Sequence, residues 1–263
     1  MRIPFTEDQT RPVRYTFWCL LFLFGHMVSN QLDRTVLELA RSADPGLLAV
    51  FRTITEAGDS KWTLVPTGVL GLGLMAAGWF ILADRRAAAM ARWAGSAFMF
   101  VFVSVALSGI AVNIAKVIIG RGRPTLLEQS GFSGFDPLIL DANFHSFPSG
   151  HTNTAVAFAL AVSFLLPSWR GTLLAAACLI GLSRIAVNAH FLTDVFGGGV
   201  LAVVTTYWLR ACFAARGWVF HRETGGAYRF LWPGLLLPLA TGRTLRRLWE
   251  TGAVQPPGRV RQA

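Results

Sequence analysis

Long apolar runs alternate with short polar stretches along this chain. The runs approach the roughly 20 residues that an α-helix needs to cross the hydrocarbon core of a membrane. The pattern therefore predicts an all-α, polytopic integral membrane protein with six transmembrane helices. These helices are expected near Tyr15–Leu32, Trp62–Ala83, Trp93–Ala115, Gly150–Leu166, Gly171–Ala189 and Phe191–Phe213.

The apolar runs divide the chain into three parts. Residues 15–213 form the predicted six-span domain, residues 1–14 an N-terminal arm, and residues 214–263 a basic tail. The first run is not followed by a small-residue cleavage site, which favours a membrane anchor over a cleaved signal peptide. Two prolines interrupt the apolar patch Phe230–Leu239 in the tail, so we expect it to be interfacial rather than a seventh span.

The polar stretch Asp33–Lys61 also contains apolar positions on both sides of Pro45-Gly46. This arrangement predicts one or two short amphipathic helices that lie at the membrane interface. Two roles fit such helices. They can form a packing cap over the bundle, or they can act as a gate for substrate.

Composition supports a membrane protein and argues against a nucleic-acid-binding protein. Of the 263 residues, 53% are hydrophobic and 14% are charged, whereas a typical soluble domain has about 25% charged residues. The net charge of +10 comes mainly from arginines spread over short loops and the tail. There they act as topology signals and as contacts for anionic lipid head groups. The three cysteines lie in or beside apolar runs, so neither a disulfide framework nor a zinc site is expected.

The distribution of arginines predicts the orientation of the helices. Arginines precede the first span, follow the sixth, and occupy the connections between spans two and three and between spans four and five. With six spans all of these segments lie on one side, which the positive-inside rule makes cytoplasmic. Both termini are then cytoplasmic. The opposite side receives Asp33–Lys61, Lys116–Pro148 and Ser183–His190.

On this opposite side, the ends of two predicted spans carry fixed positive charges. They are Lys116, Arg123 and Arg184. Arginine offers a planar fork to phosphate oxygens, and lysine offers a compact charge. A single residue of this kind is usually an interfacial anchor. A charged group at membrane depth is expensive, however, and several that gather at one face indicate a function.

The tetrapeptide Pro148–His151 opens the fourth span. Proline suits the first turn of a helix, Ser149 can cap it, and Gly150 allows the backbone to approach an anion closely. The free N–H groups and the dipole at a helix start favour a bound anion. The alternative is an ordinary capped helix with an interfacial His151.

His190 and Asp194 are four residues apart near the start of the sixth span, where they share one helix face. Asp194 can bond one ring nitrogen of His190 and leave the other free to attack an electrophile. A purely structural His–Asp pair is the alternative. Among the other histidines, His145 is close enough to the motifs to touch substrate, whereas we expect a packed His26 and a surface His221.

Two glycine-containing stretches, Gly71–Ala76 and Gly197–Gly199, lie within apolar runs. We interpret them as sites of close helix packing rather than as phosphate-binding loops, because their setting is helical.

In chain order, three motifs resemble the signature of the type 2 phosphatidic acid phosphatase family, which also includes the vanadium haloperoxidases. The motifs are Lys116-x6-Arg123-Pro124, Pro148-Ser149-Gly150-His151 and Ser183-Arg184-x5-His190-x3-Asp194. They cover residues 116–194 and match the family pattern in order and spacing. The segment Ile54–Trp62 is similar to one in bacterial members of the family, including lipid A 1-phosphatases.

The resemblance implies a phosphatase that uses neither a metal nor another cofactor. In such an enzyme His190 is the nucleophile that forms a phosphohistidine, Asp194 orients it, and His151 protonates the leaving oxygen. Water then hydrolyses the intermediate. The residues implied to hold the phosphoryl oxygens are Lys116, Arg123, Ser149, Gly150 and Arg184.

Resemblance and topology together imply a lipid phosphatase of the bacterial inner membrane with a periplasmic active site. Lipid A, undecaprenyl diphosphate, phosphatidylglycerol phosphate and phosphatidic acid all remain open as substrates, and the oligomeric state is open. Two further functions also remain. One is a phosphotransferase that passes the phosphoryl group to a second lipid. The other is a non-catalytic protein that binds or transports lipid phosphates, against which the intact His190–Asp194 pair argues.

Overall fold

The computed structural model describes residues 32–131, 134–223 and 226–230, and these residues are mostly helical. Residues 32–41 form the first described helix. The elements that follow are α2 (Pro45–Glu56), α3 (Lys61–Ala76), η1 (Ala77–Ile81), α4 (Arg85–Ile119), α5 (Pro124–Ser130), η2 (Ala142–Phe144), α6 (Gly150–Leu165), η3 (Pro167–Trp169), α7 (Arg170–Ala186), α8 (Leu192–Ala215), β1 (Phe220–Arg222) and β2 (Tyr228–Phe230).

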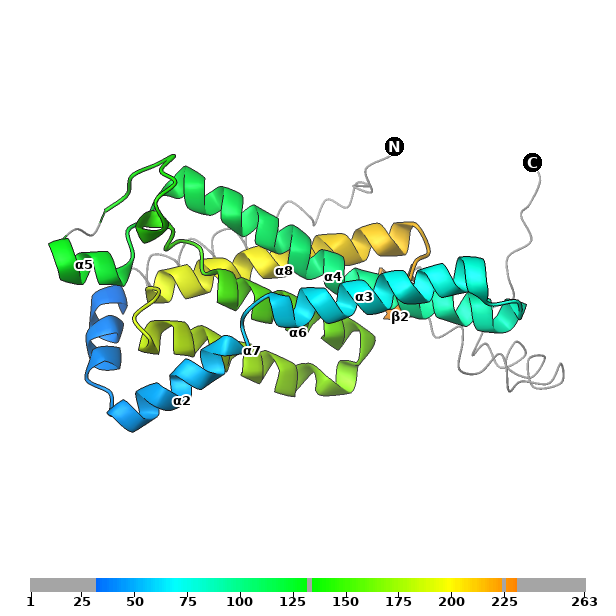
Figure 1. Cartoon of the computed structure of the whole chain (residues 1–263), viewed down its shortest axis with the longest axis horizontal. Helices are drawn as coiled ribbons and strands as arrows, with labels where there is room; N and C mark the ends of the chain where they lie inside the picture. The colour runs from blue at the N-terminus through cyan, green and yellow to red at the C-terminus, as the bar shows by residue number, and fades with distance from the viewer. Residues whose placement is uncertain (1–31, 132–133, 224–225, 231–263) are drawn as a thin grey trace.

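The long helices run side by side along the long axis of the molecule (Figure 1). α6 packs against α4, α7 and α8, and α3 packs along α4. Within the described residues, four helical segments are long and apolar enough to cross a membrane: Pro45–Ile81, Arg85–Ile119, Pro167–Ala186 and Leu192–Ala215. α6 is apolar but shorter.

Five of the six predicted spans coincide with described helices, which confirms the mostly helical fold. The remaining one, Tyr15–Leu32, lies outside the described residues except for its last residue. The total number of spans and the orientation of the helices therefore stay predictions.

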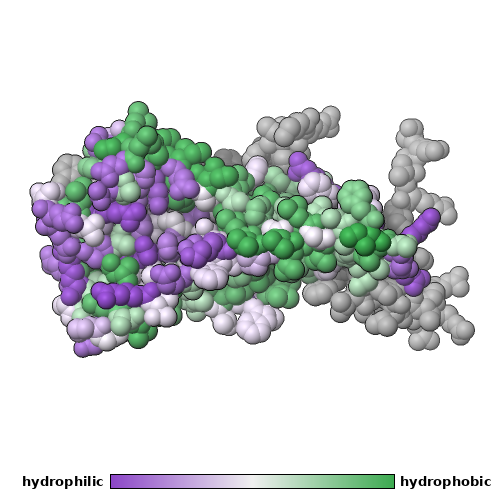
Figure 2. Space-filling model, in the orientation of Figure 1, coloured by the Kyte–Doolittle hydropathy of each residue, from purple (hydrophilic) through white to green (hydrophobic). Residues whose placement is uncertain are grey.

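The stretch expected to form short amphipathic helices does so, as residues 32–41 and α2. Asp44 caps α2, since its carboxylate accepts the Gly46 N–H at 2.7 Å. Leu47 and Val50 of α2 are about half exposed. Together with α5 these helices lie at one end of the bundle, on the left in Figure 1. Figure 2 shows hydrophilic side chains gathered over this end and hydrophobic ones along α3 and α4.

An aromatic cluster away from this polar end includes a hairpin that the sequence patterns did not predict. The Phe100 ring of α4 packs edge-to-face against the Phe213 and Phe220 rings, with distances between ring centroids of 5.1 Å and 4.8 Å, respectively. Phe220 belongs to β1, which pairs antiparallel with β2. In the segment after α8, Val219 and Phe220 are buried in this core, and Phe230 packs against it.

The turn after α4 determines where the first motif lies. Gly120 ends α4 with a φ of 58°, and a Cβ atom there would meet the Asp136 carbonyl oxygen at 1.7 Å. Only glycine fits this position. Asp136 N–H donates to the Gly120 carbonyl at 2.7 Å, and Arg123 N–H donates to the Asn143 carbonyl at 2.8 Å. These bonds hold the segment from Arg121 to Arg123 against the loop that precedes α6.

Candidate active site

The three motifs meet at the polar end of the bundle. A Cβ atom on Gly150, at the start of α6, would lie 3.6 Å from Lys116 Nζ of α4. The Ser149 N–H donates to the backbone carbonyl of Asp194 at 2.9 Å. His190 is close enough to Arg123 and Arg184 for their charges to interact. Segments more than 70 residues apart in sequence therefore form one site.

His190 and Asp194 are buried beside each other. Their side chains are 2% and 0% exposed, and His190 Nδ1 lies 3.6 Å from Asp194 Oδ2. This distance is longer than a normal hydrogen bond, and Nδ1 has no closer partner among the described residues. The start of α8 holds the carboxylate, because Asp194 Oδ2 accepts the Phe191 N–H at 2.8 Å. Asp194 therefore faces Nδ1 and leaves Nε2 as the nitrogen available for chemistry.

The surroundings keep His190 neutral near pH 7. Burial lowers the pKa of His190 to about 4; the charges of Arg123 and Arg184 act in the same direction, and Asp194 opposes them. A neutral imidazole keeps a lone pair on one nitrogen, which is what a nucleophile needs.

The three predicted cations surround the histidines, and the two arginines are each anchored by one hydrogen bond of the guanidinium group. Arg123 Nε donates to the Ala142 carbonyl at 2.9 Å, and burial lowers the pKa of the Arg123 guanidinium. Arg184 Nη1 donates to Thr55 Oγ1 at 2.5 Å. The charges of Arg123 and Arg184 both reach Lys116. Three cations this close repel one another, so the site favours an anion that would neutralise them.

The start of α6 completes the candidate phosphate site. Ser149 is fully buried, and its Oγ accepts the Thr152 hydroxyl at 2.9 Å. The close approach of α8 fixes this turn, since a Cβ atom on Gly198 would lie 2.4 Å from the Ser149 carbonyl oxygen. The first N–H groups of α6 have no partner within the helix and favour an anion. His151, the next residue, interacts electrostatically with Arg184 and His190.

Two residues that the motif pattern did not single out, Arg121 and Asp33, hold Asp194 in place. Arg121 Nη1 donates to Asp194 Oδ1 at 2.6 Å, and Arg121 Nη2 pairs with Asp33 Oδ2 at 2.7 Å. Asp33 Oδ1 also accepts the Thr193 N–H at 2.9 Å. Ser146 Oγ donates to Asp194 Oδ2 at 2.5 Å. The position of Arg121, two residues before the motif residue Arg123, could have pointed to it in the sequence. No local sequence pattern connects Arg121 to Asp33.

The end of α2 and the turn that follows it pack on Arg184 and His151. Thr55 is buried and binds Arg184. A Cβ atom on Gly58 would lie 3.1 Å from His151 Cβ and 2.8 Å from Ile180 Cγ2. This is the segment Ile54–Trp62 that resembles bacterial members of the family, and it forms a wall of the site.

The remaining sequence candidates lie elsewhere. His145 Nε2 bonds to the Ile139 carbonyl at 3.1 Å, His221 is exposed on β1, and His26 is outside the described residues. Gly71 makes a close helix contact, as expected, because a Cβ atom there would lie 2.8 Å from Met99 Sδ of α4. The close contact of Gly197 is instead with the loop before α6, since a Cβ atom there would lie 2.5 Å from the Phe147 ring. In the described part of the chain, no three His, Cys, Asp or Glu side chains gather as metal ligands.

Comparison with known proteins identifies the family. A model of the PAP2 superfamily matches residues 97–218. Lipid A 1-phosphatase from Rhizobium johnstonii is 33% identical over 180 residues, which cover 68% of this chain and 71% of that protein. The chain belongs to the PAP2 superfamily. This confirms the resemblance seen in the three motifs.

Further PAP2 relatives agree with this assignment. Phosphatidylglycerophosphatase B from Bacillus subtilis is 27% identical over 207 residues, which cover 70% of this chain and 88% of that protein. The fold is shared with the crystal structure of a transmembrane PAP2-type phosphatidylglycerolphosphate phosphatase from Bacillus subtilis. That match has a TM-score of 0.52 at 21% identity, and covers 78% of this chain and 97% of that chain. Both curated relatives are lipid phosphatases by name.

We predict that Arg121→Gln and Asp33→Asn are coupled. Arg121→Gln leaves two buried carboxylates unpaired, and breaking a buried ion pair in this way costs about 3–5 kcal/mol. Asp33→Asn in the same chain removes one of these charges and should recover part of the lost stability. Thermal unfolding in detergent, measured for both single variants and the double variant, tests this. Strictly additive effects would contradict the network.

We also predict that the His190 side chain stays neutral at pH values well below those at which histidines usually titrate. A histidine free in water titrates near pH 6.5. Because the pKa of His190 is lowered, its proton should bind only as the pH falls toward about 4. The measurement is a ¹⁵N-histidine NMR titration in micelles, with His190 assigned by comparison with His190→Gln. A midpoint at or above pH 6 would show that the histidine is not buried as described.

Proposed function

We propose that this PAP2 protein hydrolyses the phosphomonoester or diphosphate head group of a membrane lipid through a phosphohistidine on His190. The observation that carries the proposal is the buried His190–Asp194 pair surrounded by Lys116, Arg123 and Arg184. These groups supply a neutral nucleophile and fixed cations in one water-poor site, which is what phosphoryl transfer without a metal requires.

The first step transfers the phosphoryl group to the enzyme. His190 Nε2 attacks phosphorus, and the bond between phosphorus and the lipid oxygen breaks. His151 donates a proton to that oxygen, so the lipid leaves as an alcohol or, for a diphosphate, as a phosphate. Asp194 stabilises the positive charge that develops on the His190 ring, as in other nucleophile–carboxylate pairs.

The second step releases phosphate. His151, now without its proton, accepts one from water, and the water oxygen attacks the phosphohistidine. The bond between phosphorus and Nε2 breaks, inorganic phosphate leaves, and both histidines return to their starting states. In both steps the cations, Ser149 and the first N–H groups of α6 hold the equatorial oxygens. Removing one such electrostatic stabiliser typically lowers the rate by about 10²–10³, which we expect for Arg184→Ala.

The substrate is a lipid because the site lies at one end of an apolar bundle. The names of the relatives favour lipid A 1-phosphate and phosphatidylglycerol phosphate, and undecaprenyl diphosphate and phosphatidic acid complete the panel. The same intermediate could pass its phosphoryl group to a second lipid. Product analysis separates the two reactions, since hydrolysis yields free phosphate and transfer yields a phosphorylated acceptor.

We place the site on the periplasmic face of the inner membrane. α4 carries Arg85 and Arg86 at its first turn and Lys116 near its last. A 35-residue helix is about 50 Å long, so these groups lie on opposite sides of a bilayer. The arginines at the far end carry the cytoplasmic signal, which supports an outward-facing site.

The proposed mechanism predicts a covalent phosphoenzyme whose formation requires His190. Wild-type protein mixed rapidly with a ³²P-labelled lipid and quenched in alkali should carry up to one phosphate per chain. His190→Ala should carry none and should release no phosphate. His145→Ala is the matched control and should behave as wild type, because His145 bonds to a loop carbonyl. Phosphate release should persist in excess EDTA. Full labelling of His190→Ala would overturn the nucleophile assignment, and activity restored only by a divalent metal would overturn the metal-free mechanism.

The orientation is tested with single cysteines in a background without Cys19, Cys178 and Cys212. Ser130 at the end of α5 and Ala83 in the turn before α4 are both exposed, at opposite ends of the bundle. In intact cells with a permeabilised outer membrane, an impermeant thiol reagent should label Ser130→Cys and leave Ala83→Cys unlabelled. The reverse pattern would turn the site toward the cytoplasm.

A further inference from the structure

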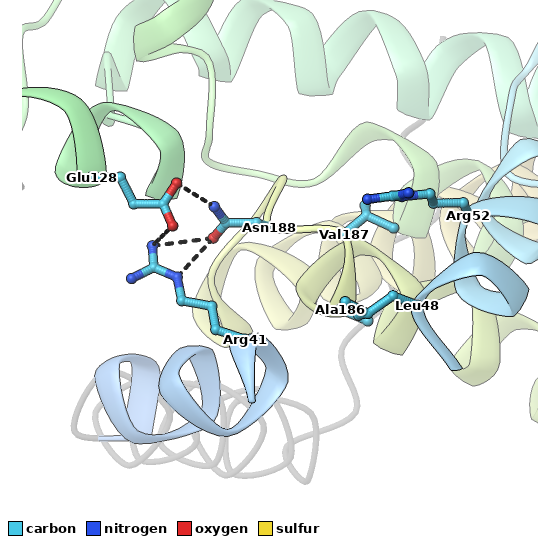
Figure 3. Close-up of a pocket in the computed structure, with 7 residues that line it drawn as sticks. All are labelled: Arg41, Leu48, Arg52, Glu128, Ala186, Val187 and Asn188. Atoms are coloured by element: carbon cyan, nitrogen blue, oxygen red, sulfur yellow. Dashed lines mark hydrogen bonds and ion pairs between the residues drawn. The ribbon is translucent and has the colours of Figure 1, made fainter. Parts of the chain in front are cut away.

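A second pocket borders the active site. It has a volume of about 350 Å³ and lies between residues 32–41, α2, α5 and the turn after α7 (Figure 3). The residues that line it are Arg41, Leu48, Arg52, Glu128, Ala186, Val187 and Asn188. None of them is a specified residue of the three motifs, although Ala186, Val187 and Asn188 lie in the unspecified stretch between Arg184 and His190.

Three of the polar residues in this pocket are joined to one another by hydrogen bonds and an ion pair. Arg41 Nη2 pairs with Glu128 Oε1 at 3.0 Å and donates to Asn188 Oδ1 at 3.3 Å. Asn188 Nδ2 donates to Glu128 Oε2 at 2.9 Å. The charges of Arg41 and Glu128 therefore cancel, and the group forms a polar wall without net charge.

Arg52 supplies the net positive charge of the pocket. Its side chain is exposed, and it has no hydrogen bond or ion pair with any described residue. Figure 3 shows it extending from α2 toward Val187, with no dashed line to the Arg41–Glu128–Asn188 group. A free guanidinium offers a planar fork of N–H donors that suits phosphate oxygens.

The pocket and the catalytic site share their walls. The turn Ala186–Asn188 connects Arg184 to His190 along the chain. Arg52 and Thr55 are three residues apart on α2, which places them on one helix face about 5–6 Å apart at Cβ, and Thr55 binds Arg184 at 2.5 Å. An anion on Arg52 would therefore sit roughly one head group away from a phosphoryl group on Arg184.

We infer that this pocket binds a second anionic group on the lipid head group, with Arg52 as its ligand. The inference rests on the proposed function, since it assumes that a lipid phosphate occupies the catalytic site. The group expected on Arg52 is a phosphodiester or second phosphate, and hydroxyl groups between the two phosphates would meet the polar wall. The pocket would thus select head groups with two phosphates over those with one.

The test compares two lipids that differ in this group. Phosphatidylglycerol phosphate carries a phosphodiester beside its terminal phosphomonoester, whereas phosphatidic acid carries only the monoester. In micelles of a neutral detergent, Arg52→Ala should lower kcat/KM for phosphatidylglycerol phosphate by about 10- to 100-fold, the usual range for a lost charge-assisted hydrogen bond. The change should appear mainly in KM. Hydrolysis of phosphatidic acid should stay within about twofold of wild type, and Arg52→Lys should recover part of the loss.

Arg34→Ala is the matched control, because Arg34 is also exposed at this end of the molecule but does not line the pocket. It should leave both substrates unchanged. Equal losses on both lipids in Arg52→Ala would identify a general contact with the membrane surface and overturn the subsite. No change on either lipid would also overturn it.

A binding measurement separates this inference from the proposed function. His190→Ala cannot form the intermediate, so equilibrium binding of the two lipids to it is independent of turnover. Adding Arg52→Ala should weaken its binding of phosphatidylglycerol phosphate and spare that of phosphatidic acid. If wild-type protein released no phosphate from any lipid, the proposed function would fail, while this selective loss would still support the subsite. If Arg52→Ala changed the binding of neither lipid to His190→Ala, the subsite would be rejected and the proposed function would be unaffected.

Discussion

The buried carboxylate of Asp194 is the constraint on which the rest of the site depends. A buried charge is tolerated only when it is paired and hydrogen-bonded. The Asp194 carboxylate accepts hydrogen bonds from the Arg121 and Ser146 side chains and from the Phe191 N–H. Arg121 in turn binds Asp33. These contacts tie the start of α8 to the turn after α4 and to residues 32–41. The orientation of His190 therefore depends on segments from three separate parts of the chain.

The two ends of the bundle are stabilised in different ways. At one end, aromatic rings from α4, α6 and α8 close around Phe220 of the hairpin, and burial of apolar surface is enough to hold them. At the other end, close backbone contacts bring cations together that would otherwise repel. Gly120 turns the chain beside Asp136, and Gly198 admits the Ser149 carbonyl. The apolar end thus provides a rigid support on which a highly charged site can be assembled.

In the proposed function, the charges at the polar end bind phosphate but cannot by themselves distinguish one phosphorylated lipid from another. Lys116, Arg123 and Arg184 would bind any phosphoryl group, since their field acts on charge and not on the rest of the head group. Discrimination must then come from neighbouring surface. The turn Ala186–Asn188 lies between Arg184 and His190 in the chain, and its own residues line the second pocket. In the proposed function, a single backbone segment would therefore link catalysis to the selection of the head group.

Local patterns in the sequence were sufficient to predict most helices and to single out the residues that the structure brings together at the polar end of the bundle. Apolar runs reflect burial within a helix or bilayer, and the spacing of His190 and Asp194 reflects one turn of a helix, so both can be recognised without the fold. The tertiary structure alone revealed the partnership of Arg121 with Asp33, the contact of Thr55 with Arg184, the packing of Gly58 on His151, and the hairpin around Phe220. Asp33 and Arg121 are 88 residues apart, and each looks like an ordinary surface charge in its own segment. Such pairs are decided by which helix ends meet, because the free energy of a buried ion pair depends on geometry that no local pattern encodes.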